Sequence, residues 1–370
     1  MLPRGDAGMT ATGSATVGST TAALDVRAAV VEPGNANPVL RALALPARNV
    51  GTTLVQVVAA PLNPLDLLIA SGTFHSVRHD APYVPGSECV GVVRESASFA
   101  PGSWVYGECR PSPEAPGAFA THVLLPDENL LRLPDGLDPV AAAAVGNSGT
   151  AAYMPLVETA GMRTGETVLV LGATGAVGQL AIQIARLRGA GRVVGVGRDA
   201  AALQRLLELG ADAVVDLRAD EPVDGLAARL LAAAGPTDVV LDGVYGRPLE
   251  AALQMCAPRA RIVNIGNAAG ATAVIPAGLL RGRQLTLSGF AGLHTPLQDK
   301  RAGLTWLWSA MAAGGLQVEV RAFPFDELPA AWRAQATSPH AKCVVVHGDR
   351  RQLGRTPTPL GHPTTDESET

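Results

Sequence analysis

The chain has 370 residues, of which 47% are hydrophobic and 17% charged, and its formal net charge is −4. This length can bury two cores, and the absence of a basic block argues against nucleic acid or an anionic membrane as partner. No apolar run approaches the length of a membrane span. Four scattered cysteines and no secretory signal favour a reducing, cytoplasmic location; the cysteines are Cys89, Cys109, Cys256 and Cys343.

The first 22 residues are rich in Gly, Ser, Thr and Ala, and we expect a flexible tail there. Residues 23–141 contain short apolar runs separated by Gly and Pro, which predict a β-rich domain. Expected strands are Asp25–Val31, Thr53–Ala59, Val90–Val93 and His122–Leu125. One short helix is predicted to begin at Pro64, with Asn63 as its cap, and to end at Gly72.

Residues 142–290 change to a regular alternation of strand and helix. An alanine-rich helix is expected from Pro139 and a second from Gly149. Strand Val168–Leu171 then begins a doubly wound parallel sheet. The expected further strands are Arg192–Val196, Ala213–Asp216, Asp238–Asp242, Arg261–Ile265 and Gln284–Ser288, and the expected helices are Gln179–Arg188, Ala200–Leu209, Leu226–Ala234 and Pro248–Cys256.

Residues 291–348 return to strand composition at Val318–Phe325 and Lys342–His347, around a helix at Gly303–Ala313. The β-rich domain is therefore predicted to be discontinuous. Residues 349–370 are polar and are expected to form a second flexible tail.

Gly172, Gly175 and Gly178 separate the first strand of this sheet from the helix after it. Strand, glycine turn and helix form the context of a dinucleotide-binding fingerprint. Backbone N–H groups can approach a pyrophosphate there, and the helix N-terminus adds partial positive charge. The alternative is an ordinary tight turn.

The end of the second strand bears on which nicotinamide cofactor is bound. NAD-specific sites place a carboxylate there for the ribose 2′-hydroxyl. This sequence has the small Gly197 followed by Arg198 and Asp199. Arg198 could grip a 2′-phosphate, which favours NADPH over NADH, or it could be a solvated loop residue. Asp199 could oppose a phosphate, but its expected role is to cap the helix from Ala200.

Several short motifs occur in a recognisable order. They are Leu62-Asn63-Pro64-Leu65-Asp66, Pro85-Gly86-Ser87-Glu88, Gly117-Ala118-Phe119-Ala120, Gly149-Thr150-Ala151, the glycine turn, Asp242-Gly243-Val244, Ile265-Gly266 and Ala341-Lys342-Cys343. Over about residues 23–348 the chain resembles the medium-chain dehydrogenase/reductase superfamily, in its zinc-independent quinone oxidoreductase branch. The resemblance implies a GroES-like catalytic domain, a Rossmann domain and an active site in the cleft between them.

The resemblance also implies particular site residues. Asn63 would line the nicotinamide and substrate pocket and Thr150 would help to seat the cofactor, although both could instead be helix caps. Phe290 could line the nicotinamide site or belong to the core. Lys342 could reach the cofactor or substrate, or it could be solvated. The remaining expected cofactor-binding residues are Gly172, Ala173, Thr174, Gly175, Ala176, Val177, Gly178, Arg198, Asp242, Val244, Ile265 and Gly266.

Zinc-dependent relatives use an early cysteine and a histidine as ligands. Here those places hold Asn63 and Ser87, so we expect no zinc. The predicted reaction is then hydride transfer to a quinone or an α,β-unsaturated carbonyl, with a small hydrophobic acceptor as substrate. Relatives carry tyrosines where this chain has Leu68 and Phe74, so no acid or base residue is assigned. Tyr153, His75 and His79 are candidates for this role, and each could instead be a structural or surface residue.

Two further functions remain open from the sequence. One is an enoyl-thioester reductase of secondary metabolism, and the other is a non-catalytic NADPH-binding sensor. The resemblance also implies a homodimer that pairs the last Rossmann strand, here Gln284–Ser288, across a two-fold axis.

Overall fold

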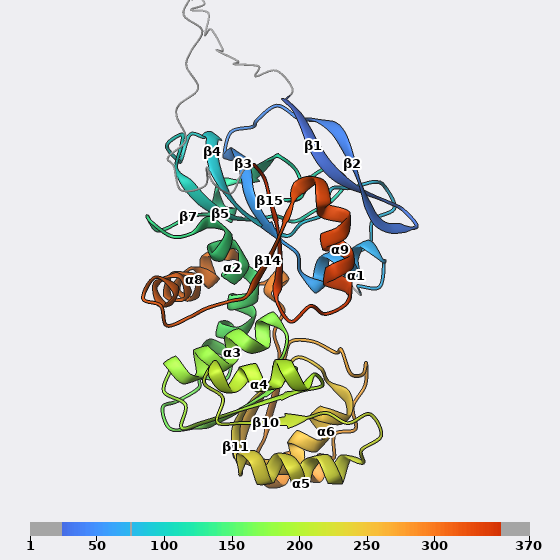
Figure 1. Cartoon of the computed structure of the whole chain (residues 1–370), viewed down its shortest axis with the longest axis vertical. Helices are drawn as coiled ribbons and strands as arrows, with labels where there is room; N and C mark the ends of the chain where they lie inside the picture. Colours follow the sequence, from blue (N-terminus) through green and yellow to red (C-terminus); the bar gives the residue numbers. More distant parts are fainter. Residues whose placement is uncertain (1–23, 75, 349–370) are drawn as a thin grey trace, which may run out of the picture.

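The computed structural model describes residues 24–74 and 76–348. The two predicted tails, 1–22 and 349–370, lie outside these residues. Figure 1 shows a β-rich part at the top and an α/β part below it, with α2 (Pro139–Tyr153) running between them. Among the described residues, no helix is both long and apolar enough to cross a membrane.

The lower part is a six-stranded parallel sheet in the order β10-β9-β8-β11-β12-β13. This order confirms the predicted doubly wound Rossmann sheet. In chain order its strands are β8 (Thr167–Leu171), β9 (Arg192–Gly197), β10 (Ala213–Asp216), β11 (Thr237–Asp242), β12 (Cys256–Asn264) and β13 (Thr286–Gly289).

Helices cover both faces of this sheet because its central strands, β8, β9, β11 and β12, have apolar side chains on both sides. α3 (Ala176–Leu187) and α4 (Ala200–Glu208) contribute Leu180, Ile184 and Leu206 to the core on one face. α5 (Val223–Ala234) and α6 (Gly246–Met255) contribute Leu230 and Leu249 to the core on the other. The carboxyl ends of the strands thereby stay open toward the β-rich part.

The upper part is a seven-stranded sheet in the order β14-β15-β3-β4-β5-β7, with β6 also paired to β3, and a separate hairpin of β1 and β2. β14 and β15 follow the Rossmann domain in the chain, so the discontinuity of this domain is confirmed. The strands are β1 (Leu24–Glu32), β2 (Asn35–Leu45), β3 (Thr52–Pro61), β4 (Glu88–Glu95), β5 (Trp104–Glu108), β6 (His122–Pro126), β7 (Leu130–Arg132), β14 (Val320–Pro324) and β15 (Lys342–Val346).

Three α-helices accompany this sheet. α1 begins at Pro64, as predicted, and ends at Ala70. α9 packs against β15, β2 and α1, and α8 packs against α2 (Figure 1). The bounds of the last two are Leu297–Ala312 for α8 and Leu328–Ala336 for α9.

Several elements differ from the sequence-based expectation. Sequence reasoning missed β2, β5, β7, α9 and a short helix, α7 (Ala277–Arg283). The last Rossmann strand begins at Thr286, because Gln284 takes a left-handed conformation (φ 53°) that ends α7.

The expected second helix from Gly149 is wrong, since α2 continues through it to Tyr153 and passes into a π-helical turn (Met154–Thr159). Gly146 and Gly149 do not break α2 because each permits a close approach. A Cβ at Gly146 would lie 2.3 Å from Glu88 Oε2, and one at Gly149 would lie 2.9 Å from Leu307 Cδ1. Tertiary packing here outweighs the low helix propensity of glycine.

Candidate functional site

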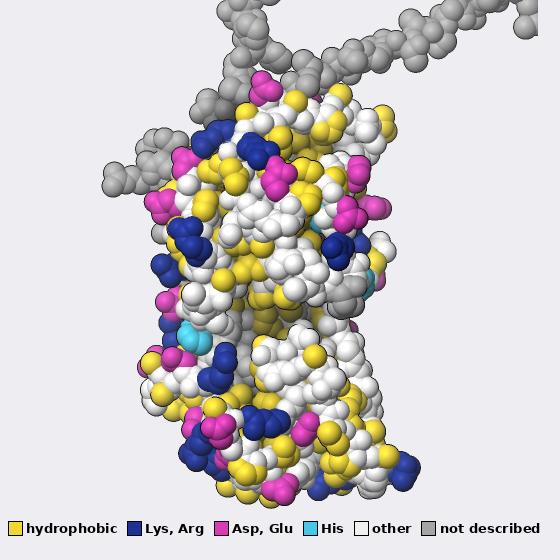
Figure 2. Space-filling view, turned by 90° about the vertical axis from the view of Figure 1, so that its right-hand side faces the viewer, with side chains coloured by type: hydrophobic (Ala, Val, Ile, Leu, Met, Phe, Trp, Pro, Cys, Tyr) yellow, Lys and Arg dark blue, Asp and Glu magenta, His cyan; other side chains and the backbone are white. Residues whose placement is uncertain are grey.

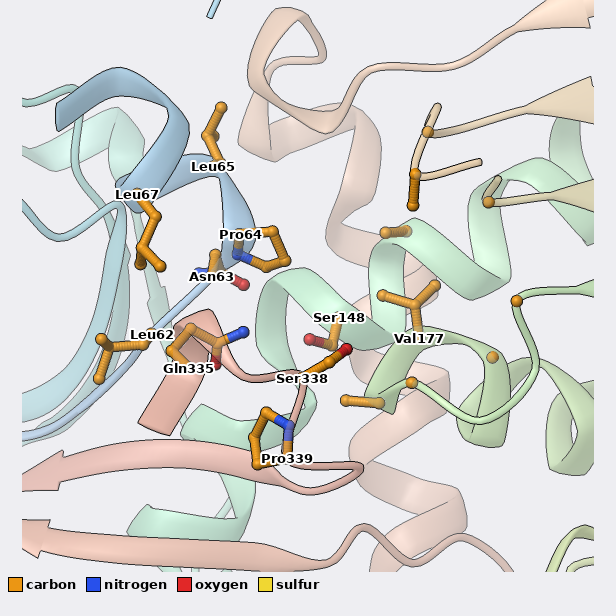
Figure 3. A pocket seen from close by; sticks show the side chains of 18 of the residues that line it. Leu62, Asn63, Pro64, Leu65, Leu67, Ser148, Val177, Gln335, Ser338 and Pro339 are labelled. Atoms are coloured by element: carbon orange, nitrogen blue, oxygen red, sulfur yellow. The ribbon is translucent and has the colours of Figure 1, made fainter. Parts of the chain in front are cut away.

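A cavity of about 920 Å³ lies between the two parts of the molecule, at the carboxyl ends of the Rossmann strands. Figure 2 shows this hollow between the upper and lower halves, with hydrophobic side chains inside it. In Figure 3 Asn63, Pro64 and Leu65 lie on one side of the cavity, Val177 lies on the other, and Ser148 lies between them. This is the expected position for a ligand in an open α/β sheet.

The glycine turn forms one wall of the cavity. Gly172 has a φ of 81°, and a Cβ on it would lie 2.9 Å from Val244 Cγ1. A Cβ on Gly178 would lie 2.4 Å from Ala173 Cα, so only glycine allows α3 to pack against the turn. The N-cap of α3 is Gly175, without a side-chain capping bond, so the first N–H groups of a 12-residue helix remain available for an anion.

Most residues of the fingerprint line the cavity, namely Gly172, Thr174, Gly175, Ala176, Val177 and Gly178. Ala173 does not, because it is fully buried beneath the turn. The donor groups and the space that a pyrophosphate requires are therefore both present at this wall.

The loop after β9 also borders the cavity. Arg198 is exposed and lines it, next to Gly197, whose Cβ would lie 2.5 Å from Thr174 Cγ2. Asp199 accepts a 2.8 Å hydrogen bond from the Ala202 N–H, so it caps α4 as predicted. A guanidinium thus borders the cavity, while the carboxylate beside it is engaged by its own helix.

At the strand ends, Val244, Ile265 and Gly266 line the cavity as expected. Asp242 is buried behind them and accepts hydrogen bonds from the N–H groups of Val244 (3.1 Å) and Tyr245 (2.8 Å). Burial raises the pKa of Asp242. Through these two hydrogen bonds the carboxyl stabilises the turn that contains Val244.

Two more expected residues lie outside the cavity lining. Phe290 packs against the Rossmann core. Thr150 is buried in the middle of α2, where its hydroxyl donates to the Asn147 carbonyl (3.0 Å), so it is neither a cap nor a wall residue. The preceding turn of α2 supplies Asn147 and Ser148 to the cavity instead.

The opposite wall carries a buried polar network around Asn63. Its Nδ2 donates to Glu88 Oε1 (2.9 Å) and to Ser87 Oγ (3.1 Å). Its Oδ1 accepts from Lys342 Nζ (2.6 Å), which also donates to Ser148 Oγ (2.8 Å). Lys342 is only 2% exposed, so the solvated-lysine alternative is wrong. The start of α1, the middle of α2 and the start of β15 thus converge on one point of the cavity.

Two carboxyl groups complete this network. Glu88 Oε2 accepts from the Tyr106 hydroxyl (2.9 Å) and from the Asn147 N–H (2.6 Å). Asp66 Oδ2 accepts from the Asn63 N–H (2.8 Å), and burial raises the pKa of Asp66 to about 7. Burial also lowers the pKa of Lys342, against the attraction of Glu88 and Asp66.

The weak proton-donor candidates do not meet at this site. Tyr153 packs against Trp306, with ring centroids 5.1 Å apart, outside the cavity lining. His79 lines a smaller, separate pocket beside Tyr83, and His75 lies outside the described residues. Apolar side chains on this side of the cavity are Leu62, Pro64, Leu65, Leu67, Leu68, Phe74 and Trp332, and the polar side chains of Asn37, Ser71, Arg333 and Gln335 also line the cavity.

Sequence reasoning missed His340 and Gln179. Gln179 Nε2 donates to the carbonyls of Thr174 (2.9 Å) and His340 (2.6 Å), and His340 Nδ1 lies 3.1 Å from the Thr174 carbonyl. This contact joins the start of α3 to the loop before β15. No sequence signal could have found it, because the partners are more than 160 residues apart.

Comparison with known proteins agrees with this architecture. Residues 49–135 match the alcohol dehydrogenase GroES-like domain, and residues 176–309 match the zinc-binding dehydrogenase family. The quinone oxidoreductase of Sus scrofa is 30% identical over 229 residues, which are 61% of this chain and 67% of that protein. A mitochondrial enoyl-[acyl-carrier-protein] reductase of Xenopus tropicalis is 34% identical over 44% of this chain and 47% of its own length.

A third relative is much longer than this chain. A phenolphthiocerol/phthiocerol polyketide synthase of Mycobacterium tuberculosis is 31% identical over 313 residues, 82% of this chain, but the match spans only 14% of that protein. Among solved structures, the quinone oxidoreductase of Thermus thermophilus, also solved with NADPH, has a TM-score of 0.69 and 32% identity, covering 86% of this chain and 99% of its own.

Together with the six-stranded sheet and its glycine turn, these matches support an NAD(P)-dependent oxidoreductase. The chain belongs to the medium-chain dehydrogenase/reductase superfamily, and within it the chain is similar to the quinone oxidoreductases.

Proposed function

We propose that this protein is an NADPH-dependent reductase that transfers hydride to a quinone or an α,β-unsaturated carbonyl without zinc. The observation that carries the proposal is one continuous cavity with two different walls. The glycine turn, the α3 N-terminus and Arg198 form one wall, and the other contains the Asn63–Lys342 pair and the leucines of α1. A charged dinucleotide and a hydrophobic acceptor can therefore meet in one space.

The preference for NADPH rests on the loop after β9. Arg198 offers a planar, permanently charged donor group at the cavity, and Gly197 beside it allows the Thr174 side chain to pack closely, because a Cβ there would lie 2.5 Å from Thr174 Cγ2. The Thermus relative, solved with NADPH, has this fold. When bound, the cofactor supplies the hydride; the glycine turn and Arg198 would hold its phosphates. Asn63 and Ser148 border the space for the acceptor, and the leucines of α1 keep water from it.

Independence from zinc is part of this proposal, and the chemistry of the polar wall supports it. Among residues 24–74 and 76–348, no group of three or more His, Cys, Asp or Glu side chains could hold a metal ion. In addition, the Lys342 ammonium lies 2.6 Å from Asn63 Oδ1, at the place where zinc-dependent relatives have a ligand. A divalent cation bound there would be repelled by this ammonium.

The test is oxidation of NADPH by a panel of quinones and short enones, with EDTA present and NADH in parallel. We expect turnover that prefers NADPH and is insensitive to EDTA. Loss of activity on chelation would contradict the zinc-free interpretation. Tight NADPH binding without oxidation by any acceptor would favour the sensor function instead.

A second candidate is reduction of an enoyl thioester. It is favoured by the apolar wall along α1, where Leu68 is 42% exposed and still lines the cavity, so that an acyl chain could continue outward from the site. The similarity to the Xenopus enoyl-[acyl-carrier-protein] reductase supports the same candidate. Faster turnover of an enoyl-CoA than of free quinones would select it.

A further inference from the structure

Lys342 has the position and the free bonding capacity of a proton donor. An ammonium carries three N–H groups. Two of them donate to Asn63 Oδ1 and Ser148 Oγ, and within the described chain no third acceptor contacts Nζ. Lys342 lines the cavity, as do both of its partners. One N–H is therefore left for a ligand on the acceptor side.

The surroundings of Lys342 both fix the amine and make its proton easier to lose. The side chain is buried, since only 2% of the residue is exposed. Its position is set by β15, by Asn63 at the start of α1 and by Ser148 of α2. The charged and titratable groups around it are Glu88 on β4, Asp66 on α1 and the neighbouring Cys343. Desolvation lowers the pKa of Lys342, while these three groups oppose that shift.

From this geometry we infer that Lys342 is the general acid that protonates the acceptor after it has received hydride. This inference rests on the proposed function. Hydride forms a new C–H bond on the acceptor and leaves an enolate or quinol anion. One Nζ–H bond of Lys342 then breaks, and its proton forms the O–H or C–H bond that completes the reduction. The neutral amine regains a proton from water after the product leaves. Nothing besides water and the reduced cofactor is consumed.

The Lys342 amine can be followed by NMR with little signal overlap, because the sequence contains two lysines, Lys300 and Lys342. Full-length protein grown with side-chain-labelled lysine would give two NMR signals, and Lys342→Arg would identify one of them. Lys300 is an internal reference, since its Nζ pairs with Glu108 (2.7 Å) outside the cavity lining. We expect the Lys342 signal to titrate below the ordinary lysine range and to shift when NADP⁺ and an unreactive enone analogue are added.

Kinetics then test the role itself. Wild-type enone reduction should fall as pH rises through the value at which the Lys342 signal titrates, because the acid form is lost. Lys342→Met should bind NADPH with unchanged affinity but lose about 10²- to 10⁴-fold in turnover, together with this pH limb. Lys342→Arg keeps the positive charge but cannot release a proton, so it should not restore turnover. Lys300→Arg is the matched control and should behave like wild type.

Other results would overturn the assignment. If Lys342→Arg turned over at the wild-type rate, Lys342 would act only by stabilising negative charge. If Lys342→Met did so, Lys342 would have no role in turnover. If none of the acceptors supported NADPH oxidation by the wild type, the proposed function would fail. The NMR signals of the two lysines would still show whether Lys342 is a titrating group that contacts a ligand in the cavity. A Lys342 signal that titrates below the ordinary lysine range and shifts with the enone analogue supports an acid in the cavity. A Lys342 signal that responds neither to pH in this range nor to the analogue contradicts it.

Discussion

Asp66 makes the stability of this protein depend on pH in a direction opposite to that of an ordinary carboxylate. Burial raises the pKa of Asp66 from 3.8 to about 7. A raised carboxyl pKa means that the folded chain binds its proton more tightly than the unfolded chain does. The resulting stabilisation is complete below about pH 4 and is lost as the pH rises through 7. Between about pH 5 and pH 8 this loss amounts to about 2.5 kcal/mol.

The variant Asp66→Asn keeps an oxygen for the Asn63 N–H but cannot titrate. Urea unfolding followed by tryptophan fluorescence, at about pH 5 and pH 8, would give the difference in unfolding free energy between variant and wild type at each pH. We expect the variant to gain about 2.5 kcal/mol relative to wild type over this interval. Asp25→Asn, at an exposed position on β1, is the control. An equal difference at both pH values would refute the argument that burial governs Asp66.

Three other changes test the cofactor wall and the sheet edge. Arg198→Ala should weaken NADPH binding by about 10- to 100-fold and leave NADH binding almost unchanged, as measured by titration calorimetry; equal losses for both would contradict the role of Arg198. Gly178→Ala should destabilise the fold by about 1–3 kcal/mol and impair NADPH binding, because the new Cβ would lie 2.4 Å from Ala173 Cα. The control is Gly225→Ala in α5, which should be neutral or stabilising because the nearest atom to its Cβ would be 3.5 Å away. We also propose a homodimer that forms through β13, an edge strand whose one neighbour within the described sheet is β12. Thr286→Lys at this edge should shift the sedimentation coefficient toward that of the monomer, and an unchanged sedimentation coefficient would exclude this interface.

The Rossmann half of the fold could be predicted in detail because its signals are local. Continuous apolar strands such as Val168–Leu171, glycines at turns, and amphipathic helices each follow from short stretches of sequence. Helix α2 could not be predicted in this way. Its glycines indicate a break from local propensity, whereas the contact of Gly146 with Glu88 and Tyr106 comes from residues some 40 to 60 positions earlier.

The site shows the same division. The glycine turn, Arg198, Val244, Ile265 and Gly266 were predicted and line the cavity, because each belongs to a motif at a strand end. Lys342 was placed in the site by resemblance alone, and its burial against Asn63 and Ser148 depends on three elements that meet only in the folded chain. Asp242 belongs to the same strand-end motif as Val244, and Thr150 was placed by resemblance; both lie behind the cavity wall, where they support the backbone.

The central claim is that this cavity brings a reduced nicotinamide and an unsaturated acceptor into direct contact. The most direct measurement uses NADPH carrying deuterium at C4, on either face, with an enone as acceptor, and mass spectrometry of the product. We predict that one of the two labelled cofactors delivers its deuterium to carbon in the product. NADPH oxidation without deuterium in the product from either face would contradict direct hydride transfer.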